Sequence, residues 1–354
     1  MKYLRLLLFP FSLIYGLVVI IRNWLYDAGL FKSHQFNLPV IVIGNLEVGG
    51  AGKSPMTEYL VRLLKSGNKL AILSRGYGRD TKGYILADTS STATQIGDEP
   101  AQFKTKFPDI TVAVCEDRVH GINQLLPQHN LIVLDDAYQH RAVKPGLSIL
   151  LFDYSKITQP HLLLPAGNWR EPFSGRWRTN VIIITKCPEG LNEDEQGKLA
   201  AFVKPLPYQQ LYFTTIAYQN LQDMSSNDVD ITLDATTTVF LLTGIANAQP
   251  LLHHLEKFTP DIVHHNYPDH HQFSLKNISK LAEDFAACKS QKKAIITTEK
   301  DAQRLREQSL QSLVNQLPIL VLPIGVHFLN NSGNDFDKTV KEYVSEYTKH
   351  HQLH

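Results

Sequence analysis

A glycine-rich segment that ends in a lysine and a serine, GNLEVGGAGKSP at residues 44–55, has the spacing of a phosphate-binding loop. In such loops the backbone N–H groups surround the phosphates of a nucleotide, while the lysine contacts the β- and γ-phosphates and the hydroxyl ligates magnesium. Lys53 and Ser54 would take the last two roles. The residues expected to line the nucleotide are Glu47, Val48, Gly49, Gly50, Ala51, Gly52, Lys53 and Ser54.

One position departs from the usual pattern of the loop. Glu47 stands where the first glycine of G-x-x-x-x-G-K-[ST] is expected, so a carboxylate accompanies a loop that binds anions. Gly49 and Gly50 can supply the turn instead. We expect the Glu47 side chain to face solvent or a nearby basic group and to point away from the phosphates.

Two adjacent aspartates follow the apolar run LIVL. Asp135 and Asp136 would be delivered to the carboxyl edge of a parallel sheet, where the ligands of such sheets bind. One carboxylate can hold magnesium through its water shell, and the other can position a ligand. An aspartate after a strand can also simply cap a helix, but its combination with GKS favours a nucleotide site.

Further charged residues lie in glycine- or proline-containing loops. Arg75 and Arg79 in SRGYGR suit an anionic substrate, although an ordinary turn with solvated charges explains them equally well. Asp98 in GDEP could act as a base toward a hydroxyl group. Arg170 and Glu171 have the look of a salt-bridged turn. The adjacent histidines in YPDHHQF are more typical of a structural position than of a zinc site.

The apolar runs that must position these residues are continuous, as expected for strands buried on both faces of a parallel sheet. In the first half they lie at 38–45, 69–75, 110–115, 130–136, 147–153 and 180–186, with helices expected over 55–66 and 116–126. Residues 208–221 suggest a hairpin or an edge strand. Strands within 237–247, 261–273, 292–305 and 317–326 then alternate with helices near 248–258, 275–290 and 333–349.

The sequence therefore predicts an α/β fold, with a P-loop-type, mostly parallel sheet covered by helices on both faces and a second, smaller α/β domain. We divide the chain into an N-terminal membrane-interface helix (1–30), a nucleotide-binding domain (31–205), a hairpin-like linker (206–236) and the smaller domain (237–354).

The N-terminal helix rests on the uncharged run from Leu6 to Ile21. Its 16 residues fall short of the roughly 20 that span a bilayer, and no small-residue cleavage site follows, as a signal peptide would require. Arg22, Trp24 and Tyr26 suit a membrane interface. We expect a helix that dips into the cytosolic face of a membrane; the alternative is a buried helix of the fold.

Composition narrows the class of protein. Among 354 residues, Lys+Arg 35 and Asp+Glu 34 leave a net charge of +1, so nothing attracts nucleic acid. The three cysteines, Cys115, Cys187 and Cys288, are far apart, which argues against a disulfide framework or a structural zinc site and favours a reducing, cytosolic setting.

Taken in order, the motifs resemble those of the tetraacyldisaccharide 4′-kinases, the lipid A 4′-kinases of Gram-negative bacteria. The resemblance rests on GNLEVGGAGKSP, SRGYGR, GDEP, LDDAYQH, LLPAGNWREP, YPDHHQF and TTEKDAQRL, and it extends to about residue 325. It implies transfer of the γ-phosphate of MgATP to the 4′-hydroxyl of a tetraacylated glucosamine disaccharide 1-phosphate, which gives lipid IVA. It further implies a peripheral enzyme on the cytoplasmic face of the inner membrane, without an obligate protein partner, whose active site lies between two domains joined by a hairpin-like stem.

The resemblance also implies roles for single residues. Asp98 is similar to the family's catalytic base and His270 to its partner from the second domain. Arg118 and Arg170 would neutralise phosphate charge, and Arg75 and Arg79 would face the substrate. The magnesium ligands would come from Ser54, Asp135, Asp136, Gln139 and Glu171. Ala137 and Tyr138 depart from the family's usual Gly-Phe, and Ser54 from its commoner threonine.

Two other functions compete with this interpretation. One is a P-loop kinase or ligase that acts on a soluble small molecule, for which the N-terminal apolar segment would have no purpose. The other is a non-catalytic, membrane-associated nucleotide switch. A guanine-binding switch would need Asn-Lys-x-Asp at a strand end, whereas the strand over 180–186 ends in Lys186 without that aspartate.

Overall fold

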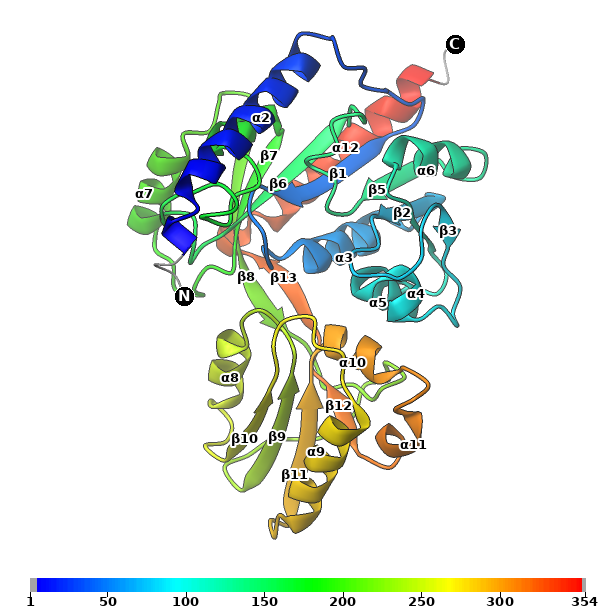
Figure 1. Ribbon diagram of the computed structural model, residues 1–354, viewed down its shortest axis with the longest axis vertical. Coiled ribbons are helices and arrows are strands. Elements are labelled where there is room, and N and C mark those ends of the chain that lie inside the picture. The colour runs from blue at the N-terminus through cyan, green and yellow to red at the C-terminus, as the bar shows by residue number, and fades with distance from the viewer. Residues whose placement is uncertain (1–4, 352–354) are drawn as a thin grey trace.

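A computed structural model describes residues 5–351, which form a larger and a smaller α/β domain (Figure 1). The larger domain is built on a nine-stranded sheet in the order β13-β8-β7-β6-β1-β5-β2-β4-β3. All neighbours pair in parallel except the edge pairs β3–β4 and β13–β8. The strands are β1 (Val40–Asn45), β2 (Leu70–Ser74), β3 (Ile85–Leu86), β4 (Thr111–Val114), β5 (Leu131–Leu134), β6 (Leu147–Asp153), β7 (Val181–Thr185), β8 (Gln210–Tyr218) and β13 (Ile324–Phe328).

Both faces of this sheet are covered, and its central strands β1 and β5 are accordingly buried along their whole length. One face packs against α3 (Lys53–Leu64), α4 (Ala93–Ile96), α5 (Asp98–Lys106) and α12 (Gly333–His351). The other face packs against α6 (Arg118–Leu125) and α7 (Glu193–Val203). A 3-10 helix, η1 (Phe173–Arg178), precedes β7. The expected doubly covered, mostly parallel sheet is confirmed.

The smaller domain has a four-stranded parallel sheet in the order β10-β9-β11-β12. Its strands are β9 (Thr237–Thr243), β10 (Ile262–Asn266), β11 (Lys292–Thr297) and β12 (Ile319–Val321). Its helices are α8 (Gln249–Leu255), α9 (Leu275–Ala287), α10 (Glu299–Leu305) and α11 (Gln311–Val314). Two apolar clusters, one on each face of the sheet, form its core.

The C-terminal segment returns to the larger domain, so the expected smaller domain over 237–354 extends too far. Strand β13 pairs antiparallel with β8, and η2 (Leu329–Asn331) leads into α12. Phe336 and Val340 of α12 are fully buried in the core of the larger sheet. The two-stranded connection between the domains is therefore β8 with β13, and β8 (Gln210–Tyr218) is the strand expected within residues 208–221 (Figure 1).

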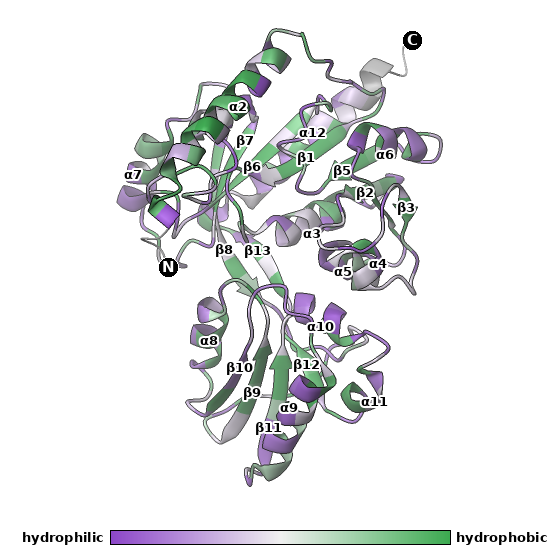
Figure 2. Cartoon of the chain, in the orientation of Figure 1, coloured by the Kyte–Doolittle hydropathy of each residue, from purple (hydrophilic) through white to green (hydrophobic). Residues whose placement is uncertain are grey.

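Helix α2 (Phe9–Asp27) lies along the outside of the larger domain (Figure 1). Ser12, Gly16 and Val19 face the protein, whereas most of its large apolar side chains are exposed, Ile14 by 62% and Leu17 by 59%. Figure 2 shows this apolar helix on the surface. Within residues 5–351 it is the one helix long and apolar enough to cross a bilayer. The alternative of a buried core helix is therefore wrong.

Candidate active site

The glycine-rich loop connects β1 to α3, as the motif requires. Gly49 and Gly52 have φ angles of +109° and +84°, in the left-handed region that favours glycine. The turn is thus made by Gly49 and Gly52, whereas Gly50 was expected in place of Gly52. Lys53 and Ser54 open α3, where the N–H groups of the first helical turn are free to bind an anion. The local geometry matches a phosphate-binding loop.

Glu47 is buried at the start of this loop, with 4% of its surface exposed. Its backbone forms a bridge to Trp169, which anchors the loop to residues 168–170. Burial raises the pKa of the carboxyl, and the nearby Lys156 and Lys186 oppose that rise. Of the two expected orientations, the solvent-facing one is wrong, and the one toward basic groups agrees with the structure.

Lys53, Arg170 and Asp136 converge at the carboxyl end of the central strands. The Lys53 ammonium donates to Asn45 Oδ1 over 3.2 Å and lies 3.5 Å from Asp136 Oδ2. The two terminal nitrogens of Arg170 donate to the two oxygens of Asp136 over 3.3 and 2.9 Å. Burial alone would raise the pKa of Asp136, but Lys53 and Arg170 lower it to about 2. This carboxyl is therefore ionised and shared by two cations.

Asp135 lies beside it in a different environment. It is 2% exposed and accepts hydrogen bonds from Thr57 Oγ1 (3.2 Å) and Ser74 Oγ (3.3 Å). Burial, followed by the charges of Glu99 and Asp136, raises its pKa to about 7. Burial thus disfavours the ionised form of this carboxyl, which a bound cation would stabilise.

The donors present fit a magnesium ion bound together with a nucleotide. Magnesium prefers hard oxygen ligands and keeps several waters, so one or two carboxylates suffice. Asp135 and the buried Ser54 hydroxyl provide oxygens of this kind. Within the described part of the chain no group of three or more His, Cys, Asp or Glu side chains is arranged to hold a metal. The site therefore resembles a shared protein–phosphate magnesium site more than an all-protein cage.

Gln139 and Glu171, the other two expected ligands, lie in different surroundings. Gln139 donates from Nε2 to the Asn45 carbonyl over 2.9 Å, and its buried Oε1 has no hydrogen-bond partner among the described residues. Glu171 accepts from Arg178 over 2.8 Å and from Asn23 of α2 over 3.2 Å. Glu171 Oε1 is likewise buried without a hydrogen-bond partner among the described residues and lies 3.6 Å from Arg22 of α2. Each of the two residues therefore keeps one oxygen that accepts no hydrogen bond from the described residues, and Glu171 is in addition directed toward α2 and Arg178.

The three remaining arginines differ in burial and in their partners. Arg118 is 3% exposed and donates to the Asp136 carbonyl over 3.3 Å, while burial and the neighbouring Arg75 lower its pKa to about 10. Arg75 itself is exposed. Arg79 pairs with Glu116 over 2.6 Å, and its side chain is 2% exposed. A substrate contact is open to Arg75, whereas the structure gives Arg79 a structural role.

Asp98 and His270 meet across the domain boundary. Asp98 opens α5 of the larger domain, and His270 follows β10 in the smaller one. His270 Nδ1 lies 2.9 Å from Asp98 Oδ2. Burial would raise the pKa of Asp98, but hydrogen bonds from His270 and Arg304 lower it to about 2. The same contact with Asp98 raises the pKa of His270. The structure brings together the two residues that the resemblance pairs.

Several residues of this region were not predicted from the sequence to belong to the site. Arg304 binds Asp98, Lys300 pairs with Glu99 over 2.6 Å, and Asn45 accepts from both Lys53 and Arg170. Lys186 pairs with Asp153 over 2.8 Å and donates to the Gly50 carbonyl. Asn45 ends β1 and Lys186 directly follows β7, and the end of a buried strand is the signal that could have identified these two residues. Lys300 and Arg304 lie within α10.

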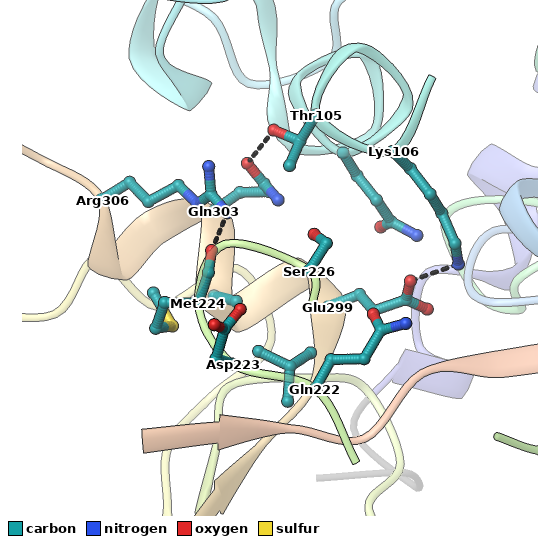
Figure 3. A pocket seen from close by; sticks show the side chains of 12 residues that line it. Thr105, Lys106, Gln222, Asp223, Met224, Ser226, Glu299, Gln303 and Arg306 are labelled. Carbon is teal, nitrogen blue, oxygen red and sulfur yellow. Dashed lines mark hydrogen bonds and ion pairs between the residues drawn. The ribbon is translucent and has the colours of Figure 1, made fainter. Parts of the chain in front are cut away.

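The domain boundary continues away from Asp98 along α5 and α10. There Thr105 Oγ1 donates to Gln303 Oε1 over 3.2 Å, and Lys106 pairs with Glu299 (Figure 3). A cavity of about 20 Å³ lies between these side chains. It has room for about one water molecule, so this end of the boundary is a polar contact and not a substrate site.

Comparison with known proteins agrees with this geometry. A family model described as tetraacyldisaccharide-1-P 4′-kinase matches residues 4–344. The chain is 44% identical to the tetraacyldisaccharide 4′-kinase of Bacteroides thetaiotaomicron, over 97% of this chain and 94% of that protein. It is 42% identical to that of Phocaeicola vulgatus, over 95% and 94%. Its structure resembles that of LpxK from Aquifex aeolicus in complex with ATP, with a TM-score of 0.74 at 25% identity, covering 96% of this chain and 99% of that one.

Proposed function

The chain belongs to the tetraacyldisaccharide-1-P 4′-kinase family, and we propose on this basis that it transfers the γ-phosphate of ATP to the 4′-hydroxyl of a tetraacyldisaccharide 1-phosphate. It is accordingly a phosphotransferase of lipid A biosynthesis with lipid IVA as its product. The observation that carries the proposal is the meeting of a phosphate-loop lysine and a carboxylate–histidine pair. Lys300, and less strongly Lys53 and His270, lower the pKa of Glu99, which directly follows Asp98, so Lys53 acts on a residue adjacent to the pair.

In the proposed reaction the 4′-oxygen forms a bond to the γ-phosphorus. The bond from that phosphorus to the β–γ bridging oxygen breaks, and ADP leaves with its electron pair. The proton of the hydroxyl passes to the Asp98–His270 pair. All hydrogen bonds that Asp98 receives from described side chains fall on Oδ2, so Oδ1 is the oxygen available to the sugar hydroxyl.

Three cations would neutralise the transferred phosphoryl group. Lys53 and Arg170 are already gathered around Asp136, and Arg118 lies against its backbone. In a loose transition state charge accumulates on the phosphoryl oxygens, where such cations contribute most. Arg75 is our candidate for a contact with the lipid substrate because it is exposed beside Arg118.

We further propose that ATP is used as its magnesium complex. Ser54 and Asp135 would hold the metal, with Asp136 and Gln139 next to them and Glu171 as the least favoured of the expected ligands. When bound, magnesium neutralises charge between the β- and γ-phosphates. The raised pKa of Asp135 supports this assignment, since a cation would favour its ionised form.

The membrane is the proposed place of action. The exposed apolar side chains of α2 support peripheral attachment to the cytoplasmic face of the inner membrane, where an acylated substrate would lie. Neither nucleic acid nor an obligate protein partner belongs to this proposal.

The test is transfer of radiolabel from ATP to the detergent-solubilised tetraacyl disaccharide 1-phosphate. We expect labelled product with the wild type and a loss of at least about 100-fold with Lys53→Ala or Asp98→Ala. Lys198→Ala, at an exposed position on α7, is the matched control and should behave as the wild type. Consumption of ATP with a soluble sugar but not with the lipid would favour the small-molecule kinase, and slow hydrolysis without any acceptor would favour the nucleotide switch.

A further inference from the structure

Arg304 on α10 makes the strongest contact of the smaller domain with Asp98. Its Nη2 and Nε donate to Asp98 Oδ2 over 2.5 and 3.0 Å, and Nη2 lies 3.3 Å from His270 Nδ1. Residues 98 and 304 are 206 positions apart in the chain, and their side chains are 13% and 5% exposed. The guanidinium therefore lies inside the boundary between the domains and contacts both members of the Asp98–His270 pair.

Contacts within the smaller domain hold this guanidinium in place independently of Asp98. Arg304 Nη1 donates to Asp301 Oδ1 over 2.9 Å and to the Gly244 carbonyl over 2.8 Å. Asp301 is fully buried and accepts from the Gly244 N–H and from Thr298 Oγ1. The same Gly244 carbonyl accepts from the His270 N–H over 3.0 Å. One backbone group thus fixes Arg304 and His270 relative to each other.

We propose that Arg304 is a positioning residue for the phosphoryl transfer: it binds Asp98 Oδ2 where the smaller domain meets α5 and so presents Oδ1 to the acceptor hydroxyl. This inference rests on the proposed function. Arg304 contacts neither substrate in the scheme and acts through Asp98 and His270. Because Asp301 and the Gly244 carbonyl hold Nη1, the rigid plane of the guanidinium fixes the direction of Nε and Nη2 toward Asp98, which a flexible lysine side chain would not do.

A contact that only held the two domains together would not require Arg304 to lie beside both Asp98 and His270. The Lys300–Glu99 pair lies one helical turn away and already connects α10 to α5. Arg304 instead binds the same oxygen, Asp98 Oδ2, as His270, which a purely structural contact between the domains would not require. Arg304 is therefore expected to influence the proton transfer as well as the contact between the domains.

The charge of Arg304 changes the pKa values of both Asp98 and His270. Arg304 lowers the pKa of Asp98, and its positive charge also lowers the pKa of His270, against the effect of Asp98. Loss of that charge raises both pKa values, so the deprotonated forms that accept a proton appear only at higher pH. The charged groups that face the pair are Arg304, Asp269, Lys300, Asp301 and Glu99.

The experiment compares the pH profiles of kcat/KM for lipid phosphorylation in the full-length protein. We expect Arg304→Met to lower kcat by about 10- to 100-fold, to change the KM for ATP little, and to move the acidic limb to higher pH. Arg304→Lys keeps the charge and should lie between Met and wild type in both respects. Arg306→Met is the matched control, because Arg306 donates to the Met224 carbonyl and does not contact Asp98.

The proposal is overturned if Arg304→Met loses no more activity than Arg306→Met, or if it loses activity equally at every pH with an unchanged acidic limb. Should the methionine variant fail to fold, the acidic limb of Arg304→Lys decides in the same way. A wild type that does not phosphorylate the lipid refutes the proposed function. A wild type whose activity depends on Asp98 but not on Arg304 refutes this inference alone.

Discussion

Neighbouring residues of identical type behave oppositely at this site. Asp135 and Asp136 are adjacent, yet the pKa of the first is raised to about 7 and that of the second is lowered to about 2. The difference follows from their partners. Two hydroxyl groups bind Asp135, whereas Lys53 and Arg170 surround Asp136. Among the described residues, Asp135 therefore has no cationic side chain bound to it, whereas Asp136 has two.

This contrast predicts opposite effects on stability in metal-free protein. Asp135 has a folded-state pKa above its unfolded value, so its contribution is complete below about pH 4 and is lost as the pH rises through about 7. Asp135→Asn avoids that loss and should raise the free energy of unfolding at pH 8, by at most about 4 kcal/mol. Urea unfolding in EDTA at pH 5.5 and pH 8 measures it.

Asp136→Asn is the matched control with the reverse sign. The depressed pKa of Asp136 gives stability that is present above about pH 4 and lost as the pH falls through about 2, so this variant should be less stable at both pH values. Magnesium should stabilise the wild type at pH 8 but not Asp135→Asn. Equal stabilisation of the two by magnesium would contradict the assignment of Asp135 as a ligand.

Which residues could be predicted from the sequence depends on where their partners lie. Lys53 and Ser54 belong to a local pattern, and the pairing of Asp98 with His270 was implied by the resemblance to the kinase family. Arg304 was missed because its partner lies in the other domain, and no local pattern encodes a contact across 206 residues. The pairing of Arg79 with Glu116 was not predicted because only the fold shows that the two residues are close enough to bind.

At the scale of elements, one face of α2 contacts the larger domain and the opposite face is exposed. Tyr15 donates to the Arg170 carbonyl and Asn23 to Glu171, so one face supports the loop that carries Arg170. The opposite face exposes Ile14, Leu17 and Val18, among others. The helix therefore connects the candidate active site to whatever surface the apolar face contacts.

This division allows the proposed membrane contact to be tested without disturbing the site. Changing Ile14, Leu17, Val18 and Ile21 to Gln keeps the helix, since Gln is a good helix former. Each apolar side chain withdrawn from lipid costs roughly 1.5–3 kcal/mol, so binding to anionic vesicles should fall by more than about 100-fold. Activity on detergent-solubilised substrate should remain.

The matched control for this variant changes the same number of exposed apolar residues elsewhere. Leu86, Ile231, Val263 and Leu275 are exposed and lie outside α2, so their replacement by Gln should leave vesicle binding intact. If both variants bind vesicles as the wild type does, α2 is not the membrane contact.

The C-terminal helix shows what element-level patterns cannot decide. The apolar spacing at 333–349 predicted a helix, which is confirmed as α12. It did not indicate which of two sheets would receive the apolar face, because both offer apolar surfaces. The choice is made by β13, whose pairing with β8 carries the chain back to the larger sheet.

At the scale of the whole molecule, polar contacts hold the domains together beyond the covalent connection. Along α5 and α10 these are Asp98–Arg304, Glu99–Lys300, Thr105–Gln303 and Lys106–Glu299, with Thr94–Glu307 at the edge. Lys106 also pairs with Glu58 of α3 over 2.6 Å. Burial and the charge of Glu58 raise the pKa of Glu299 to about 7. Two lysines thus compensate three carboxylates at this boundary.

Removing these lysines should separate the domains without unfolding either. In the double variant Lys106→Met, Lys300→Met, Glu99 and Glu299 lose their lysine partners, and Glu58 is left with its ion pair to Arg62. Breaking a buried ion pair by removing one partner costs roughly 3–5 kcal/mol. Amides of α5 and α10 should therefore exchange hydrogen at least about 10-fold faster, while the central strands stay protected because their cores lie within single domains.

The matched control is Lys280→Met, Lys292→Met, because Lys280 and Lys292 pair with Asp284 and Asp234 inside the smaller domain. It should leave exchange in α5 and α10 and the radius of gyration in solution unchanged, whereas the boundary variant should have a larger radius and a lower kcat. Unchanged exchange and an unchanged radius in the boundary variant would mean that β8 and β13 alone set the arrangement of the domains. The meeting of Asp98 with His270 and Arg304 would then be a fixed feature of the fold, independent of the charges along α5 and α10.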